Sequence, residues 1–333
     1  MKLLPFIVIL CLMGAILLSG CVADDKNQGG AADNESVLRE SLKEYNTIIA
    51  KDPSNVTAWV KLGTIHQRLK EYENANAAYD HALELDPNLS MVWAYKGNIE
   101  HIQGNFTGAL RMYETGLRID SNNPVLWAYR GQVLVPLGRY DEALKSYDKS
   151  LALDPSRAIT AKDKGDLLKA LGRYDEALTS YGKAIAANQD YLDAARAKAD
   201  LEKSLMKYPE ALQTYEYILT KKPGDQEALI GKADTLAGMG RYEEAVEIYD
   251  TLIASSPIED ARYYTYRAYA LNAMGKYEEG LSSAEKALEI DPENSVAWNN
   301  KGSALNALGR KSEALAAYNE TVRINPDNPV AWS

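Results

Sequence analysis

The octapeptide LGRYDEAL occurs twice in this chain, at residues 137–144 and again at residues 171–178, so the two copies start 34 residues apart. Self-similarity at a fixed period of this length is the signature of a repeat architecture. Each repeat of such a protein is a small supersecondary unit that cannot bury its apolar face alone, so neighbouring repeats must stack. This period therefore constrains the fold more than any other feature of the sequence.

Three residue types recur with the same period. A proline follows an aliphatic and acidic run at Pro53, Pro87, Pro155, Pro223, Pro257, Pro292 and Pro326. A tryptophan is followed four residues later by glycine at Trp59/Gly63, Trp93/Gly97, Trp127/Gly131 and Trp298/Gly302. A tyrosine recurs at Tyr79, Tyr113, Tyr147, Tyr181, Tyr215, Tyr249 and Tyr318.

This pattern resembles the tetratricopeptide repeat family, whose motif has Trp at position 4, a small residue at 8, Gly at 15, Ala at 20, an aromatic at 24 and Pro at 32. The resemblance implies an all-α fold, a right-handed α-solenoid of helix–turn–helix repeats. We expect eight repeats within residues 56–328, at 56–89, 90–123, 124–157, 158–191, 192–225, 226–259, 261–294 and 295–328.

Each recurring position predicts a local structure. Position 15 is glycine in most repeats, as a helix end followed by a tight turn requires, so LGRYDEAL is the turn between two helices. The small residues at positions 8 and 20 predict a close contact between these helices. The recurrence of Trp at position 4 predicts a core residue. Position 7 is Lys or Arg, and we expect the stem to pack while the charge reaches water, at Lys96, Arg130, Lys164, Lys198, Lys232, Arg267 and Lys301.

The N-terminus predicts export. One positive charge at Lys2 precedes an apolar run, which is short for a membrane-spanning helix but suits a secretory signal. The run ends in Leu-Ser-Gly-Cys, which resembles a lipoprotein signal and implies lipidation of Cys21. We therefore expect a signal peptide at 1–20, a flexible tether at 21–35, and a membrane-anchored, extracytoplasmic location in the cell envelope. The alternative is an uncleaved membrane anchor.

The two ends of the repeat array are expected to differ. Residues 36–50 have apolar side chains at helical spacing and match a second helix without its first, which predicts an N-terminal capping helix. Residues 329–333 copy the start of a further repeat, which is incomplete.

Composition argues against several functions. The net charge of −10 lacks the basic stripe that phosphate binding needs, so we expect no nucleic-acid partner. Both cysteines, Cys11 and Cys21, precede the repeats, and the only histidines, His66, His81 and His101, lack metal-ligand spacing. We find no phosphate-binding loop and no nucleophile elbow, so no enzyme, cofactor or metal is expected.

The candidate binding surface is the outward stripe of each first helix, at positions 2, 5, 9 and 12, which we call the groove stripe. In the family this stripe lines a groove that commonly binds extended peptides or partner helices. Position 9 gives an aspartate ladder in the middle repeats, explained either as a solvated face with pairs such as Lys162–Asp166 and Arg196–Asp200 or as a partner-binding surface. The candidates are Asn98, Gln132, Lys162, Asp166, Lys169, Arg196, Asp200, Lys203, Asp234, Tyr269, Asn272, Asn299 and Asn306.

The expected function is a lipid-anchored scaffold that binds other proteins or extended peptide segments in assembling or tethering an envelope complex. Two alternatives stay open at this point. One is a carrier of an envelope polysaccharide, for which Tyr269 is the aromatic residue on the groove stripe. The other is a regulatory subunit of an enzyme on a separate chain.

Overall fold

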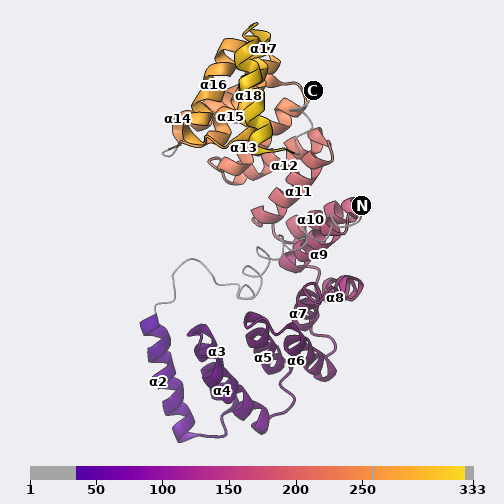
Figure 1. The fold of residues 1–333 in the computed structure, drawn as a ribbon. Helices are drawn as coiled ribbons and strands as arrows, with labels where there is room; N and C mark the ends of the chain where they lie inside the picture. Colours follow the sequence, from indigo (N-terminus) through magenta and orange to yellow (C-terminus); the bar gives the residue numbers. More distant parts are fainter. Residues whose placement is uncertain (1–34, 257–258, 327–333) are drawn as a thin grey trace. The chain divides into compact units, whose positions relative to one another are not determined.

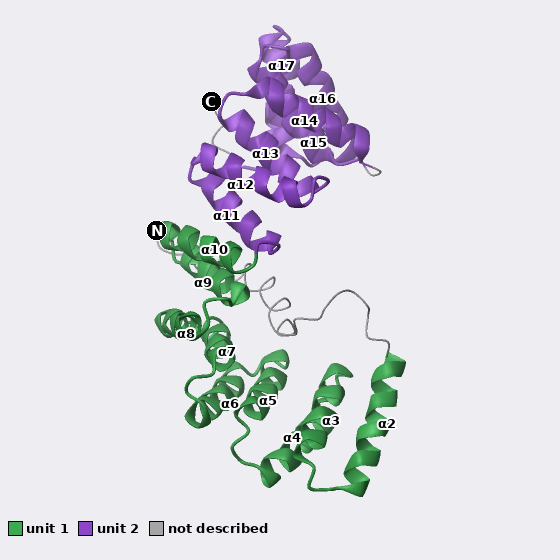
Figure 2. Ribbon diagram, turned by 180° about the vertical axis from the view of Figure 1, so that it is seen from behind, with its two compact units in different colours: residues 1–188 green, residues 189–333 purple. Residues whose placement is uncertain are grey.

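The computed structural model describes residues 35–256 and 259–326, and α-helices form all of the regular secondary structure in these residues. The chain divides into two compact units, Met1–Asn188 and Gln189–Ser333, shown in separate colours in Figure 2. The predicted all-α fold is confirmed. In each unit, consecutive helices form hairpins that stack on the next hairpin in the chain (Figure 1).

The described residues of unit 1, from residue 35 on, form a leading helix and four hairpins. Its helices are α2 (Glu35–Lys51), α3 (Val56–Arg68), α4 (Tyr72–Leu85), α5 (Ser90–Ile102), α6 (Phe106–Ile119), α7 (Pro124–Leu134), α8 (Tyr140–Leu153), α9 (Ala158–Ala170) and α10 (Tyr174–Ala187).

Unit 2 contains four further hairpins. Its helices are α11 (Leu192–Ser204), α12 (Tyr208–Lys221), α13 (Gln226–Gly238), α14 (Tyr242–Ser255), α15 (Ala261–Ala273), α16 (Tyr277–Ile290), α17 (Ser295–Ala307) and α18 (Lys311–Ile324).

A left-handed residue closes every hairpin. The six glycines at position 15 have φ values between 72° and 80°. The two repeats without glycine place Lys70 and Met206 in the same conformation, with φ of 61° and 57°. Such a conformation costs a residue with a side chain roughly 1–2 kcal/mol. The turn geometry is therefore common to all eight repeats and overrides local preference in two of them.

In the five hairpins with glycine at position 8, the close contact between the two helices is made by this glycine and the position 24 tyrosine. A Cβ atom added to Gly97 would lie 2.4 Å from Cε1 of Tyr113, and one added to Gly165 would lie 2.6 Å from Cε1 of Tyr181. The position 24 ring therefore lies directly against the position 8 backbone. The expected contact of position 20 with position 8 is also present: a Cβ atom added to Gly280 would lie 3.4 Å from the carbonyl oxygen of Ala268, and the position 20 alanines are buried, as at Ala109 and Ala177.

The tryptophans at position 4 pack at the edge of the core. Trp59, Trp93 and Trp298 pack against the buried clusters, as the sequence predicts, but all four tryptophans, Trp127 included, are only partly buried. The indole N–H of Trp59, Trp127 and Trp298 donates to the backbone carbonyl six residues earlier, at 2.8 to 2.9 Å. These rings therefore fasten the loop that precedes each hairpin and keep one edge near the surface.

Helix α2 covers the first hairpin. Leu42, Tyr45 and Ile48 pack with buried Ile49 against α3 and α4, where Leu62 and Ala78 are buried. The apolar face of the first hairpin therefore has a helical neighbour, as a stacked repeat requires.

The basic side chains at position 7 do not simply end in water. In unit 1, Arg130 lies 3.1 Å from Glu114 and Lys164 lies 2.5 Å from Asp148, each acid belonging to the preceding hairpin. The same pairing recurs in unit 2, at Lys232–Glu216, Arg267–Asp250 and Lys301–Glu285. Position 25 supplies the acid in every case. Consecutive hairpins within a unit are thus joined by an ion pair, each worth up to about 1 kcal/mol at a partly exposed site.

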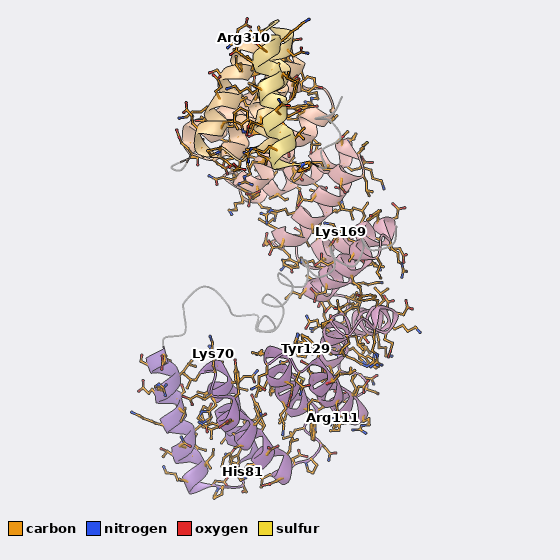
Figure 3. The ribbon with its side chains drawn as sticks, in the orientation of Figure 1. Lys70, His81, Arg111, Tyr129, Lys169 and Arg310 are labelled. Carbon is orange, nitrogen blue, oxygen red and sulfur yellow. The ribbon has the colours of Figure 1, made fainter. Side chains whose placement is uncertain are left out.

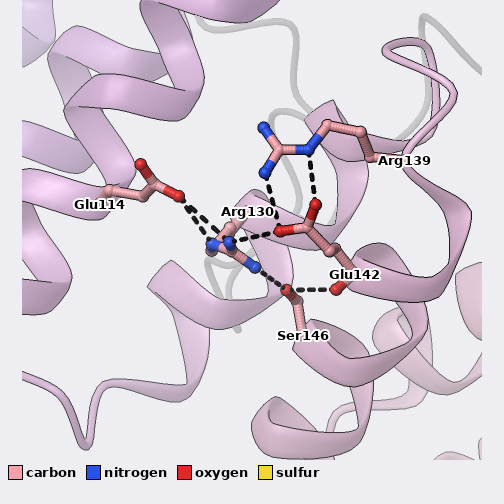
Figure 4. Close-up of polar contacts among 5 residues, drawn as sticks. All are labelled: Glu114, Arg130, Arg139, Glu142 and Ser146. Carbon is pink, nitrogen blue, oxygen red and sulfur yellow. Dashed lines mark hydrogen bonds and ion pairs between the residues drawn. The ribbon is translucent and has the colours of Figure 1, made fainter.

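Arg130 has the most extensive of these contacts (Figure 4). Its guanidinium donates to Glu114, to Glu142 at 3.2 Å and to the Ser146 hydroxyl at 2.7 Å. It also lies over the Trp127 ring, 5.9 Å from the ring centroid. The fixed, planar donor pattern of arginine explains how one side chain serves both hairpins.

Candidate functional site

The position 9 residues of the groove stripe accept hydrogen bonds from the buried tyrosines. The Tyr113 hydroxyl donates to Asn98 at 2.7 Å, and Asn98 is itself buried. The corresponding bonds to the three aspartates are Tyr181 to Asp166 at 2.8 Å, Tyr215 to Asp200 at 2.5 Å and Tyr249 to Asp234 at 2.6 Å. Neither interpretation of the aspartate ladder included this role. Each carboxylate ties the surface stripe to the core of its own hairpin.

These bonds also affect the tyrosines. Burial raises the pKa of Tyr215 and Tyr249 above the ordinary phenol value, and the neighbouring carboxylates raise it further. The phenols therefore stay protonated and remain donors at any physiological pH.

The basic residues of the stripe are partly engaged as predicted. Lys162 lies 2.7 Å from Asp166, which confirms the expected pair, and Lys203 lies 3.0 Å from Asp234 of the next hairpin. The expected Arg196–Asp200 pair was wrong. Arg196 instead bonds Asp225 at 2.9 Å and Asp193 at 3.3 Å, because the buried N-cap carboxylate of α13 lies within its reach. Periodicity could not show this partner, since it lies 29 residues away.

Gln132 departs from the position 9 pattern. Its amide N–H donates to Asp163 at 2.8 Å, while its amide oxygen is buried without a hydrogen-bond partner. Asp163 was missed by the sequence reasoning because position 6 was not assigned to the stripe. Burial and the nearby Asp166 carboxylate raise the pKa of Asp163 to about 6, against the lowering effects of Gln132, Lys162 and Arg157.

Asp163→Asn is expected to stabilise unit 1 at pH 8 by about 1 kcal/mol. The folded state binds the Asp163 proton more tightly than the unfolded state, so the protonated carboxyl stabilises the wild type at low pH, and this contribution is lost as the pH rises through about 6. The asparagine side chain does not ionise, so the variant avoids this loss of stability. Its amide N–H can also donate to the unpaired amide oxygen of Gln132.

The test is urea denaturation of both proteins between pH 5 and pH 8. The difference between them should shrink towards pH 5. A difference that is the same at both pH values would contradict the role of Asp163 ionisation, and Glu44→Gln provides an exposed carboxylate as a control.

The last repeats bring different groups to the stripe. Tyr269 is 49% exposed and meets Tyr242 edge to face, with ring centroids 6.3 Å apart. Asn272 donates to the backbone carbonyl of Asn300 at 2.9 Å. Asn299 is partly buried and Asn306 is exposed, as is Lys169 near the end of α9 (Figure 3). Lys169, Asp200, Tyr269 and Asn306 are therefore the exposed residues among the candidates from the sequence.

The histidines make contacts within unit 1. His66 lies 2.6 Å from Glu71, His81 stacks on Trp59 with centroids 4.6 Å apart, and His101 meets Phe106 edge to face. Among the described residues, no group of three or more His, Cys, Asp or Glu side chains is arranged to hold a metal ion.

The predicted lipidation residue, Cys21, lies outside the described residues, as do residues 1–34 with the predicted signal peptide and most of the tether. Within residues 35–256 and 259–326, no helix has both the length and the apolar character needed to cross a bilayer.

Comparison with known proteins gives a consistent result along the repeats. Models of the tetratricopeptide repeat match residues 56–89, 124–190, 162–226, 206–268 and 267–329. The C-terminal part of a TPR repeat-containing protein from Cytophaga hutchinsonii is 17% identical, with a TM-score of 0.57 over 71% of this chain and 96% of that one. The structure of pilF from Pseudomonas aeruginosa is 20% identical, with a TM-score of 0.53 over 66% of this chain and 99% of that one. At these identities the likeness concerns the fold.

Proposed function

Because this chain belongs to the tetratricopeptide repeat family, we propose that it is a non-enzymatic scaffold that binds other proteins through the groove stripes of its first helices. The observation that supports this most is that buried tyrosines hold the position 9 side chains in place by hydrogen bonds. Asp166, Asp200 and Asp234 each accept a hydrogen bond from a buried tyrosine, so their side chains lose little freedom when a partner binds.

The hydrogen bonds from the buried tyrosines leave some stripe residues engaged within the hairpin and others available to a partner. An extended peptide has free backbone N–H and C=O groups that exposed polar side chains can pair. Among the exposed candidates, Asp200 already accepts a hydrogen bond from Tyr215, so Lys169, Tyr269 and Asn306 are the proposed first contacts.

We place the scaffold at a membrane surface, outside the cytoplasm, in assembling or tethering an envelope complex. The support is the sequence alone: the apolar run after Lys2 and the Leu-Ser-Gly-Cys ending at Cys21. An anchor confines the chain to a surface and so raises the effective concentration of partners there. Incorporation of a labelled fatty acid that is lost in Cys21→Ser and kept in Cys11→Ser would support this placement, whereas incorporation unaffected by Cys21→Ser would contradict it.

The scaffold function is tested by affinity capture from a membrane extract with residues 22–333. The variant carries Lys169→Glu, Tyr269→Ala and Asn306→Ala, which remove exposed groups and leave the tyrosine hydrogen bonds in place. A control carries Lys183→Glu and Asn319→Ala on the exposed faces of the second helices α10 and α18.

Proteins retained by the wild type and the control but lost from the variant would place a partner on the groove stripes. Equal retention by all three would contradict the proposal. Retention of a polysaccharide in place of protein would support the carrier alternative.

A further inference from the structure

A shallow and largely open depression, which we call the hollow, lies on the second-helix side of unit 1 and is lined by residues of α6, α7 and α8. It has a volume of about 530 Å³, and Leu117 and Trp127 supply its apolar surface. Glu114, Arg130 and Glu142 form its walls, as Figure 4 shows for the polar contacts. None of these residues belongs to the groove stripe. The hollow is therefore a separate surface from the one proposed to bind partners.

The charged side chains in the walls of the hollow already form ion pairs with one another. Arg130 bonds both Glu114 and Glu142, and Arg139 donates twice to Glu142, at 2.7 and 2.8 Å. The two remaining lining residues, Arg118 and Lys145, are both exposed cations. Arg118 donates to the Thr115 hydroxyl at 2.8 Å, and neither Arg118 nor Lys145 is ion-paired with a carboxylate among the described residues. The rim of the hollow is thus positive in a chain whose net charge is −10.

This combination is specific to one pair of hairpins. Arg118 and Lys145 occupy position 29 of the second repeat and position 22 of the third. The corresponding pairs within the units elsewhere are Glu84/Arg111, Ala152/Thr179, Thr220/Glu247, Ala254/Ser282 and Glu289/Ala316, and none has two cations. The partly buried tryptophan at position 4 also has a different neighbour in the first repeat, where the His81 ring lies against Trp59 in a tilted arrangement. The repeat architecture alone does not account for the hollow.

We propose that this hollow binds an acidic peptide segment that inserts one aromatic or large aliphatic side chain against Trp127 and Leu117. Carboxylates on either side of that anchor pair with Arg118 and Lys145. The charge match selects an acidic partner, because the wall carboxylates are neutralised and the rim cations are not. The apolar floor supplies the anchor pocket that a small interface needs for measurable affinity.

The experiment measures binding of acetylated, amidated pentapeptides to residues 22–333 by titration calorimetry at low salt. The three probes are Asp-Glu-Phe-Glu-Asp, Asp-Glu-Ala-Glu-Asp and Lys-Lys-Phe-Lys-Lys. The test variant is Arg118→Glu with Lys145→Glu, and the matched control is Lys51→Glu with Lys183→Glu, which reverses two exposed cations elsewhere in unit 1. Thermal unfolding of each variant verifies that the fold is kept.

The acidic phenylalanine peptide should bind the wild type and the control with equal affinity and the test variant at least tenfold more weakly. The alanine peptide should bind at least tenfold more weakly to the wild type, and the basic peptide should bind only the test variant. No saturable binding of the acidic phenylalanine peptide, or equal binding to the test variant, would overturn the proposal. The triple groove-stripe variant should bind this peptide normally, so the two proposals fail separately.

Discussion

Tyr113→Ala is expected to destabilise unit 1 by about 4 kcal/mol, since removal of a large buried aromatic side chain costs about 3–5 kcal/mol. The ring of Tyr113 is fully buried, lies against the backbone of Gly97 and stacks near Tyr129 with centroids 5.6 Å apart. Its loss leaves a cavity within α5 and α6 and deprives the buried Asn98 of its donor. Hydrogen exchange of the α5–α7 amides in residues 22–333 measures the loss as reduced protection.

Tyr113→Phe separates the ring from the hydroxyl. It keeps the packing and removes only the bond to Asn98, so a cost of about 1–2 kcal/mol is expected. A phenylalanine variant as unstable as the alanine variant would show that the hydrogen bond, and not the ring, dominates. A negligible effect of alanine would contradict the packing argument altogether.

Asp225→Ala is expected to destabilise unit 2 by about 3 kcal/mol. Asp225 is 4% exposed, and its carboxylate caps α13 by accepting from the Ala228 N–H at 3.0 Å. It also pairs with Arg196 at 2.9 Å and with Lys222 at 3.3 Å. One substitution therefore removes a helix cap and leaves two cations without this partner. Urea denaturation, with hydrogen exchange across α11–α13, measures the effect.

Two controls divide this effect into its parts. Asp225→Asn keeps an acceptor for the cap and loses only the charge, so it should cost about 1 kcal/mol. Asn123→Ala removes a neutral cap from α7 in unit 1 and should also cost about 1 kcal/mol. The capping bond and the two cations hold the pKa of Asp225 below its usual value despite burial. The ionised group thus stabilises the fold above its unfolded pKa, and the deficit of Asp225→Asn should vanish as the pH falls through the folded pKa. A deficit unchanged in acid would argue against the ion pairs.

The hairpin is the part of this molecule that the sequence predicted best. Glycine at position 15 predicts a left-handed turn, and tyrosine at position 24 predicts a ring packed against a small residue. Both predictions concern contacts inside one hairpin. Lys70 and Met206 lack the glycine and still adopt the turn, because packing on both sides fixes it. A periodic pattern therefore predicts what occurs inside one repeat.

Contacts between hairpins were predicted less well, because a period of 34 residues does not say which neighbour a side chain reaches. The basic residues at position 7 pair with acids of the preceding hairpin, and Arg196 reaches the α13 cap instead of Asp200. Trp127 was expected in the core and is only partly buried, where it lines the hollow. Gln132 and Asp163 come together from neighbouring hairpins, a pairing that no spacing within either helix indicates.

The ion pair between successive hairpins has an evolutionary consequence. Each of the three hairpins from α3 to α8 carries an acid for its successor, at Asp80, Glu114 and Asp148. Each of the three hairpins from α5 to α10 carries a base for its predecessor, at Lys96, Arg130 and Lys164. The junctions are thus chemically equivalent. Deletion of α7 and α8 by recombination would set Glu114 opposite Lys164, and duplication of the pair would set Asp148 opposite a second Arg130. The gene can therefore gain or lose whole hairpins here without creating an unmatched charge at the new junction.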